Sequence, residues 1–447
     1  MARPIGIDLF AGAGGMSLGF EQAGFDVRAA VEIDPIHCAV HKFNFPDCAV
    51  LPQSVQDITG AEIRKAARIG NAPVAVVFGG PPCQGFSLIG HRSLDDPRNR
   101  LVLDFVRIVA ELKAKTFVFE NVKGLTVGRQ RSFLNELIKA FAEIGYNVRT
   151  KWQVLDAARY GVPQHRERLI LLGARRGVKV PEYPPRTTVP ADADTVDLED
   201  RMLPYGPTCG DALGDLPNAD VFDALEVADS TQARFGKPSV YAAELRCLTN
   251  DAWRYGHTRK WRPDILTSSA RTGHTPISRL RFAETEPGTV EPISRFYKLD
   301  AKGLCNTLRA GTDGARGAFT SPRPIHYKYD RCVTVREMAR LHGFPDWFRF
   351  HATKWHGARQ IGNAVPPPLA RAIAAEIIKA LDVRPQRSKR EIPLGDEALL
   401  NLVMQGAADH FEIDKPNTRR DRKSGAKKRS QCETEAARLA AQGGPGG

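Results

Sequence analysis

The sequence predicts an α/β protein built on a doubly wound, Rossmann-like sheet, with a smaller and less regular module beside it. Two observations carry this prediction. The first 175 residues alternate short β-rich runs with amphipathic helical patterns, as strands joined by crossover helices of a parallel sheet require. After that point the alternation stops, and proline-rich and charge-segregated segments follow. Ligands bind at the carboxyl ends of strands in such sheets, so we expect the functional residues there.

Composition limits the classes of protein that this chain can belong to. Its 447 residues are 42% apolar and carry 64 Lys and Arg against 51 Asp and Glu, a formal charge of +13. No apolar run approaches the roughly eighteen residues that cross a bilayer, and no signal-peptide pattern follows Met1. The eight cysteines show neither a disulfide framework nor zinc-ligand spacing. We therefore expect a cytoplasmic protein without a metal site, and the basic excess favours nucleic acid as partner.

Changes in composition divide the chain further. Residues 192–229 hold eleven acidic residues and one basic residue, whereas 246–281 hold eight basic residues and two Asp, interleaved with aromatic side chains. Eight basic residues against one acid also mark 415–429, where low complexity predicts disorder. The predicted units are a sheet domain over 1–175, a separate irregular module over 176–330, helical segments over 331–383 that pack back on the sheet domain, and a basic, disordered tail over 384–447.

Short runs rich in Val, Ile, Leu and Phe predict the strands of the sheet domain. Amphipathic spacing over 101–112 and 133–144 predicts two of the intervening helices, and an apolar run predicts a further helix over Leu369–Leu381. The expected strands are Ile5–Phe10, Val27–Ile33, Val74–Phe78, Thr116–Glu120 and Arg168–Gly173.

The first strand leads into a glycine turn, Gly12–Gly15, and then into a helix. Glycines let the backbone approach a ligand closely, and a helix N-terminus offers N–H groups to an anion. Ser17 stands where the dinucleotide fingerprint has its third glycine, which argues against a pyrophosphate. Glu32, at the end of the second strand, could hold ribose hydroxyls, and Asp57 could read an adenine amino group. A tight turn with a surface carboxylate is an equally good interpretation of these residues alone.

Two further strand ends carry reactive side chains. Cys83 lies at the apex of Gly-Gly-Pro-Pro-Cys-Gln-Gly, directly after a strand, where a thiolate could act as nucleophile. Cys38 and Cys48 have no such context, so we interpret them as buried apolar residues. Glu120 ends an apolar strand, and a desolvating pocket there would raise its pKa and suit it to proton donation. A Glu that only caps the next loop is the alternative.

Two arginines begin the last predicted strand. Arg166 and Arg168 share one side of an extended segment, because side chains alternate with a period of two. Together they could hold a base carbonyl or a phosphate. The alternative is a solvated pair that bridges to nearby acids.

Taken in order, these motifs resemble the DNA (cytosine-5)-methyltransferase family, of the prokaryotic type. The resemblance rests on DLFAGAGG from Asp8, GGPPCQGFS from Gly79, ENV from Glu120, QHRER from Gln164 and QIGNAVP from Gln360. It implies a class I S-adenosylmethionine-dependent methyltransferase fold, with 176–330 as target-recognition domain. The implied activity, that of a DNA (cytosine-5-)-methyltransferase, moves a methyl group from S-adenosylmethionine to C5 of a flipped-out cytosine in a specific double-stranded DNA sequence.

The resemblance also implies roles for individual residues. Cys83 would form a covalent adduct with C6 of the base, Glu120 would supply a proton near N3, Arg168 would bind the base carbonyl, and Arg166 would brace the Cys83 loop. Groove contacts would come from 246–281. Residues of the catalytic loop and one glutamine would contact DNA, namely Gln84, Ser87, Arg98, Arg100 and Gln164. The cofactor site would be lined by Asp8, Phe10, Gly12, Gly14, Gly15, Glu32, Ile33, Asp57, Ile58, Pro82, Leu101, Asn363 and Val365.

Three other functions compete with this interpretation. An RNA-directed member of the family would share the motifs, but the long 176–330 insertion and the absence of a Cys-Phe-Thr tripeptide argue against it. A catalytically silent DNA-binding relative is disfavoured because the reactive residues are present, and an oxidoreductase is disfavoured by Ser17. We expect a monomer, associated with the nucleoid in a prokaryote, that acts in a restriction-modification system beside a separate endonuclease or as an orphan enzyme.

Overall fold

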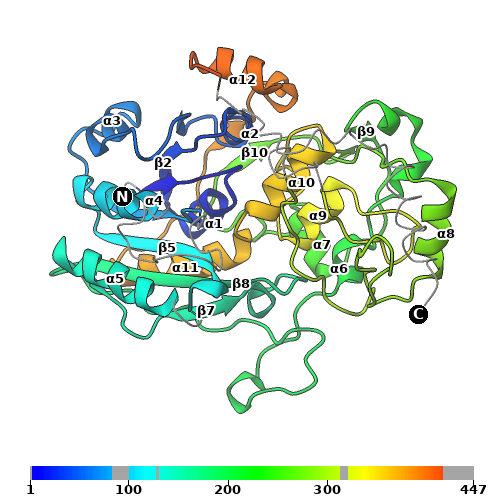
Figure 1. The fold of residues 1–447 in the computed structure, drawn as a ribbon, viewed down its shortest axis with the longest axis horizontal. Coiled ribbons are helices and arrows are strands. Elements are labelled where there is room, and N and C mark those ends of the chain that lie inside the picture. The colour runs from blue at the N-terminus through cyan, green and yellow to red at the C-terminus, as the bar shows by residue number, and fades with distance from the viewer. Residues whose placement is uncertain (1–2, 83–99, 127–129, 313–320, 416–447) are drawn as a thin grey trace, which may run out of the picture.

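The structure, a computed structural model, describes residues 3–82, 100–126, 130–312 and 321–415. Its centre is a sheet with strand order β3-β2-β1-β4-β5-β8-β6, in which β7 also pairs with β8. Figure 1 shows this sheet in blue to turquoise at one end of the molecule and the green and yellow segments at the other. The strands are β1 (Ile5–Leu9), β2 (Asp26–Val31), β3 (Ala49–Leu51), β4 (Val74–Gly79), β5 (Thr116–Val122), β6 (Tyr146–Val148), β7 (Gln153–Asp156) and β8 (Glu167–Arg175).

The sheet is mixed, which corrects the expectation of an all-parallel one. Strands β1 to β5 are parallel, whereas β8 runs antiparallel to β5, with Arg168 opposite Val122. The reversal has a direct consequence for the site. In an all-parallel sheet the start of β8 would lie at the edge opposite the end of β5. Here both lie at the same edge, together with the ends of β1, β2 and β4.

Helices cover both faces of the sheet because successive strand residues point to opposite sides. Val77 and Phe117 face a core shared with α3 (Gly60–Ala66), α4 (Arg100–Glu111) and α5 (Gln130–Glu143). Their neighbours Val76 and Val118 face a second core shared with α1 (Gly15–Ala23) and α11 (Pro367–Ala380). The predicted return of the chain after residue 331 therefore places α11 on the sheet domain. Helix α2 (Pro35–Asn44) follows β2.

The green and yellow half of Figure 1 contains short elements joined by long loops. Its first helices, α6 and α7, pack near α9, which precedes α10 at the entrance to the returning segment. The bounds are α6 (Cys209–Leu213), β9 (Thr231–Gln232), α7 (Val240–Leu245), β10 (Thr258–Lys260), β11 (Ile265–Leu266), α8 (Pro276–Glu284), α9 (Val335–Leu341) and α10 (Lys354–Asn363).

The acidic and basic stretches of this module pair with each other. Arg246 lies 3.3 Å from Asp215 and Arg271 lies 3.0 Å from Glu226, measured between nitrogen and oxygen. Arg279 lies 3.2 Å from Asp220, which belongs to the same acidic stretch. Arginines of the basic stretch therefore pair with acidic side chains of the acidic stretch, and Glu226 is 62% exposed in its pair.

Part of the basic stretch also lies on the wrong side of the sheet for groove contacts. Arg3, just before β1, donates to Tyr255 O at 2.6 Å, and Glu21 in the last turn of α1 accepts from His257 N at 3.1 Å. Glu21 also forms a buried ion pair with Arg259 at 2.8 Å. Because α1 begins at the ligand edge and ends at the opposite one, these residues lie far from the strand ends. Residues 255–259 therefore lie away from the ligand edge, and the groove contacts of 246–281 stay a prediction for the rest of the stretch.

The tail predicted to be disordered from residue 384 is folded over 384–412, which we call the C-terminal extension. It forms β12 (Glu391–Pro393), which pairs with β10, a 3-10 turn (Glu397–Asn401) and α12 (Met404–His410). Leu399 and Leu400 are 7% and 1% exposed. Composition missed this segment because its apolar residues fall in short clusters, too short for a helical or strand period. Residues 416–447 lie outside the described part of the chain, as does most of the basic run.

Two truncations should separate the extension from the residues beyond it. Among the buried side chains that deleting 384–447 removes, the large ones are Ile392, Leu399 and Leu400. Each contributes about 2 kcal/mol, so we expect the thermal unfolding midpoint to fall by on the order of 10 °C. Deleting only 416–447 should leave the midpoint unchanged and weaken DNA binding mainly at low salt, because salt screens the attraction between cationic side chains and phosphates. Equal midpoints in calorimetry of the two truncated proteins would contradict this account.

Across the described residues, no helix is both long and apolar enough to cross a membrane.

Candidate active site

The glycine turn after β1 is closed by a carboxylate from the next strand. Gly12 N donates to Glu32 Oε2 at 2.8 Å, and Glu32 Oε1 accepts from Asp34 N at 2.9 Å. Gly14 has φ 100°, and a Cβ there would lie 2.6 Å from the ring of Phe45. The turn therefore needs glycine for both its backbone angle and its close packing. The turn and the end of β2 are therefore joined by the Glu32 carboxylate.

A buried polar network lies beneath this turn. Asp8 and Ser17 are 1% and 0% exposed, and Ser17 Oγ donates to Asp8 Oδ2 at 2.6 Å and lies 3.1 Å from His41 Nε2. Burial raises the pKa of Asp8 to about 8, against the opposing effect of the Ser17 hydrogen bond. Burial also lowers the pKa of His41 to about 3. Ser17 thus fastens α1 to the end of β1, and Asp8, predicted to line the cofactor site, lies under the turn.

The other predicted cofactor residues come from several separate parts of the chain. Ile33 is 61% exposed beside Glu32, whereas Val365 is 5% exposed and its carbonyl would lie 2.6 Å from a Cβ on Gly15. The returning segment therefore touches the start of α1. Phe10, in the turn itself, has a positive φ of 60°. The remaining predicted positions are the exposed Asp57 and Asn363, the buried Ile58, the partly buried Leu101 and the exposed Pro82.

Glu120 and Arg168 meet where β5 ends and β8 begins. Arg168 Nε lies 2.8 Å from Glu120 Oε1, and both side chains are 13% exposed. A Cβ on Gly80 would lie 2.3 Å from Glu120 Oε2, so the segment that leads into the predicted thiol loop runs directly against this carboxylate. Asn121 Nδ2 donates to Pro81 O at 3.2 Å. A carboxylate, a guanidinium and the start of the thiol loop therefore share one site.

Arg166 and Gln164 face the interior. Arg166 is 1% exposed and donates to Leu308 O at 2.9 Å and to Gly362 O at 2.8 Å, and burial lowers its pKa. Gln164 is 0% exposed, with Nε2 donating to Leu341 O at 3.2 Å and Oε1 accepting from Leu308 N at 3.1 Å. The prediction that Gln164 contacts DNA is therefore wrong, because its polar atoms are bonded inside the protein. Both side chains instead hold the segment around Leu308 against the start of β8.

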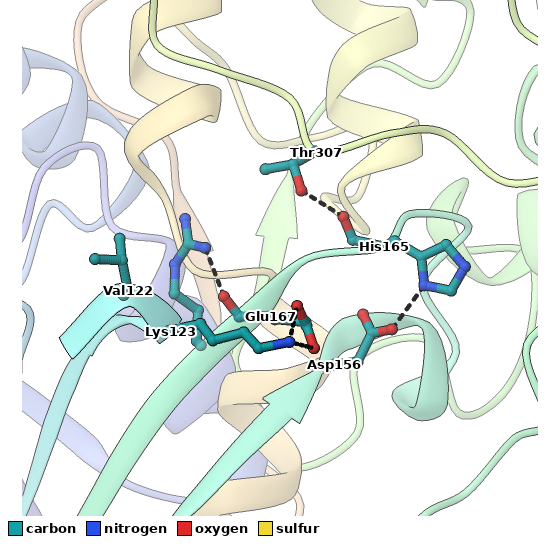
Figure 2. A pocket seen from close by; sticks show the side chains of 8 residues that line it. Val122, Lys123, Asp156, His165, Glu167 and Thr307 are labelled. Atoms are coloured by element: carbon teal, nitrogen blue, oxygen red, sulfur yellow. Dashed lines mark hydrogen bonds and ion pairs between the residues drawn. The ribbon is translucent and has the colours of Figure 1, made fainter. Parts of the chain in front are cut away.

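An open pocket lies beside the Glu120–Arg168 pair. Four of its lining residues are labelled in Figure 2: Lys123 and Glu167, which form an ion pair at 2.8 Å, and His165 and Thr307. His165 Nδ1 lies 2.6 Å from Asp156 Oδ2, and His165 Nε2 lies 3.1 Å from Asp192 Oδ1 in the acidic stretch. The hydrogen bond to Asp156 is the main cause that raises the pKa of His165 to about 9. The pocket wall therefore holds a cationic imidazolium at neutral pH.

Several predicted residues cannot be placed. Cys83 and its neighbours Gln84, Ser87 and Arg98 lie outside the described residues. The predicted brace between Arg166 and the Cys83 loop falls on the same gap. Arg100 is described and exposed, at the first position of α4.

Sequence reasoning gave no role to two residues that build this site. Gly80 makes room for the Glu120 carboxylate, and Asn121 holds the Pro81 carbonyl two residues before Cys83. Both stand inside the motifs quoted from the sequence, and an amide directly after the strand-end Glu was the available signal. His41 was missed for a different reason: nothing in a helical pattern indicates that one histidine lies under a turn 27 residues earlier.

Comparison with known proteins identifies the family. The family model for C-5 cytosine-specific DNA methylases matches residues 6–379. The chain belongs to this family. That span includes the sheet domain, the irregular module and the returning helices, and it stops short of the C-terminal extension. The chain is therefore a DNA (cytosine-5-)-methyltransferase, as the ordered motifs predict.

Individual relatives agree with this assignment. The chain is 57% identical over 416 residues to the Type II methyltransferase M.XorII of Xanthomonas oryzae pv. oryzae, covering 92% of this chain and 93% of that protein. It is 34% identical over 376 residues to the Type II methyltransferase M1.HphI of Haemophilus parahaemolyticus, covering 83% and 86% of the two chains. A crystal structure of a prophage-encoded E. coli protein, assigned as a DNA modification methyltransferase, matches with a TM-score of 0.66 at 32% identity, covering 85% of this chain and 99% of that one.

Proposed function

We propose that this protein transfers a methyl group from S-adenosylmethionine to C5 of a cytosine flipped out of a specific double-stranded DNA sequence. The observation that carries the proposal is the Glu120–Arg168 pair, held at 2.8 Å against the segment that leads to Cys83. The relatives named Type II methyltransferases support a place in a restriction-modification system, with the cognate endonuclease as a separate protein. One chain carries both the reactive residues and the recognition module, which favours a working monomer.

The residues around the glycine turn fit the proposed cofactor. Each oxygen of Glu32 accepts one backbone N–H, which leaves a lone pair on each for a ribose hydroxyl. The exposed Ile33 offers an apolar surface to an adenine ring. The turn leads to a helix N-terminus, but Ser17 is committed to Asp8, so the third glycine that a pyrophosphate needs is absent. S-adenosylmethionine bound here supplies an electrophilic methyl group on a sulfonium.

Cytosine C5 needs activation before it can attack that methyl group. We assign this step to Cys83, whose thiolate adds to C6 so that a sulfur–carbon bond forms and the C5–C6 π pair moves toward C4. Glu120 donates a proton to N3, which takes up the charge that would otherwise develop on the ring. Arg168 donates to the base carbonyl and orients Glu120 through the Nε contact. C5 then has the nucleophilic character of an enamine.

The remaining steps restore the enzyme. C5 would then accept the methyl group that bound S-adenosylmethionine supplies, and the sulfur of the cofactor would keep the electron pair of the broken bond. A base, which we take to be water, then removes the C5 proton as the C5–C6 double bond reforms. The bond between Cys83 and C6 breaks in the same elimination, and N3 returns its proton to Glu120. Protons and electrons balance, with one proton released to solvent.

Access to C5 requires the base to leave the helix. Its reacting atoms are shielded inside a duplex, and flipping costs roughly a few kcal/mol. We assign the phosphate contacts to the loop over 84–100, with Arg98 and Arg100 as cations and Gln84 and Ser87 as polar contacts. The base would enter beside Glu120 and Arg168, next to the pocket of Figure 2.

The proposal is tested by incubating purified protein with tritiated S-adenosylmethionine and unmethylated double-stranded DNA, with tRNA in a parallel tube. Label at C5 of cytosines in one short recurring DNA sequence, mapped by bisulfite sequencing, is the expected result, and it also delivers the recognition site. Label only in tRNA would assign the protein to RNA methylation instead. Cofactor binding without label in either nucleic acid would overturn the proposed activity.

A further inference from the structure

The C-terminal extension packs directly on the back of the glycine turn. Leu399 and Leu400 share a buried cluster with Ala13, which lies between Gly12 and Gly14, and with Val40 and Phe43 of α2. Ala13 is 2% exposed and Leu400 is 1% exposed. The family match ends at residue 379, so this apolar support for the turn comes from outside the family's common part.

Hydrogen bonds hold the extension in this position. Gly395 N donates to Phe43 O at the end of α2, at 2.9 Å, and Ala352 N donates to Leu400 O, at 2.9 Å. His351 donates from Nε2 to Leu402 O at 3.1 Å, while its Nδ1 accepts from the N–H of residue 353. Backbone hydrogen bonds before and after the two leucines therefore hold them in the buried cluster.

Helix α2 connects the extension to the residues that face the cofactor. Its first turn is capped by Asp34, whose side chain accepts from Ile36 N at 2.9 Å. Asp34 N in turn donates to Glu32 Oε1, and Cys38 Sγ donates to Glu32 O at 3.2 Å. A shift of α2 would therefore move Glu32. The extension touches both supports of the site, the turn through Ala13 and the carboxylate through α2.

We propose that Leu399 and Leu400 are positioning residues for cofactor binding. Their packing against Ala13 and α2 keeps the turn in the position in which Gly12 N donates to Glu32 Oε2. Neither leucine contacts the ligand itself. Truncating either side chain leaves a cavity that α2 and the turn can relax into. The inference rests on the proposed cofactor site.

The test compares two leucines with a matched residue of the same extension. Ile392 is 4% exposed and lies in β12, which pairs with β10 away from the turn. Titration calorimetry with S-adenosylmethionine should give a dissociation constant raised about tenfold by Leu400→Ala and by Leu399→Ala, because small displacements of binding groups are costly. Ile392→Ala should lower the melting temperature similarly but leave that constant within about twofold, since Ile392 is not part of the buried cluster that contains Ala13. Leu400→Met should restore most of the affinity.

A measurement on the free protein tests the effect of the leucines on the turn without any cofactor present. Hydrogen exchange of the Gly12 amide in the free protein should speed up in Leu400→Ala and not in Ile392→Ala, because that amide is bonded to Glu32 only while the turn is held. Unchanged exchange together with unchanged affinity in the leucine variants would overturn the inference, and so would equal losses in all three variants. Failure of the unaltered protein to bind S-adenosylmethionine would instead count against the proposed function.

Discussion

Replacing Cys83 with serine is expected to abolish methyl transfer while leaving cofactor binding intact. A serine hydroxyl has nearly the same size as the thiol but is hardly ionised at neutral pH, so addition to C6 loses its nucleophile. We expect the single-turnover rate to fall by on the order of 10³-fold or more. Label transfer from tritiated S-adenosylmethionine measures the rate, and titration calorimetry measures the cofactor affinity.

Cys247→Ser is the matched control for that substitution. Cys247 lies in the irregular module, and burial raises the pKa of its thiol, so it stays protonated and has no part in the mechanism. The control should keep its transfer rate within about twofold, as a substitution away from the site should. Appreciable transfer by Cys83→Ser would remove the nucleophile assignment, whatever the control does.

Replacing Glu120 with glutamine should slow transfer without weakening DNA or cofactor binding. The amide keeps the size of the carboxyl group and the room left by Gly80, but it cannot deliver a proton to N3. General acids contribute roughly 10²-fold to 10⁴-fold, so we expect a loss of at least about 10²-fold in kcat with little change in KM. Rapid-quench kinetics with saturating DNA separates the two constants.

A second glutamate–arginine pair provides the control for this prediction. Glu182 lies 2.6 Å from Arg149 on the surface, with 61% of its side chain exposed, and it belongs to neither predicted site. Glu182→Gln should leave kcat unchanged, because exposed ion pairs contribute little. Equal rates for Glu120→Gln and the unaltered protein would mean that the strand-end carboxylate only caps the loop, which was the alternative left open by the sequence.

Local patterns were enough to place five strands of the sheet and the residues at their ends, but not the short strands β3, β6 and β7. The runs that predict strands coincide with β1, β2, β4, β5 and β8 to within a few residues. Glu32 and Glu120 lie at strand ends at the same edge of the sheet, as their positions in the sequence imply. A buried strand and a glycine turn are decided by neighbours in sequence, so these features were within reach of a single chain.

Features that depend on contacts far apart in sequence were missed. Nothing in the residues of β8 indicates its antiparallel direction, which decides that Arg168 meets Glu120. The charge run at 246–281 looks like a nucleic-acid patch until Arg259 is found against Glu21, more than 230 residues away. The prediction of disorder in the C-terminal extension was wrong for the same reason, because Leu399 and Leu400 are buried only through their contacts with α2.

The central claim is that Cys83 becomes covalently joined to the target base. An oligonucleotide with 5-fluorocytosine at the methylated position tests it directly, because fluorine on C5 blocks the final proton removal and holds the adduct. Incubation with S-adenosylmethionine should give a stable protein–DNA species, and peptide mass spectrometry should locate the linkage at Cys83. Methylation of ordinary DNA by the same preparation, with no trapped species or with a linkage at another residue, would contradict the account.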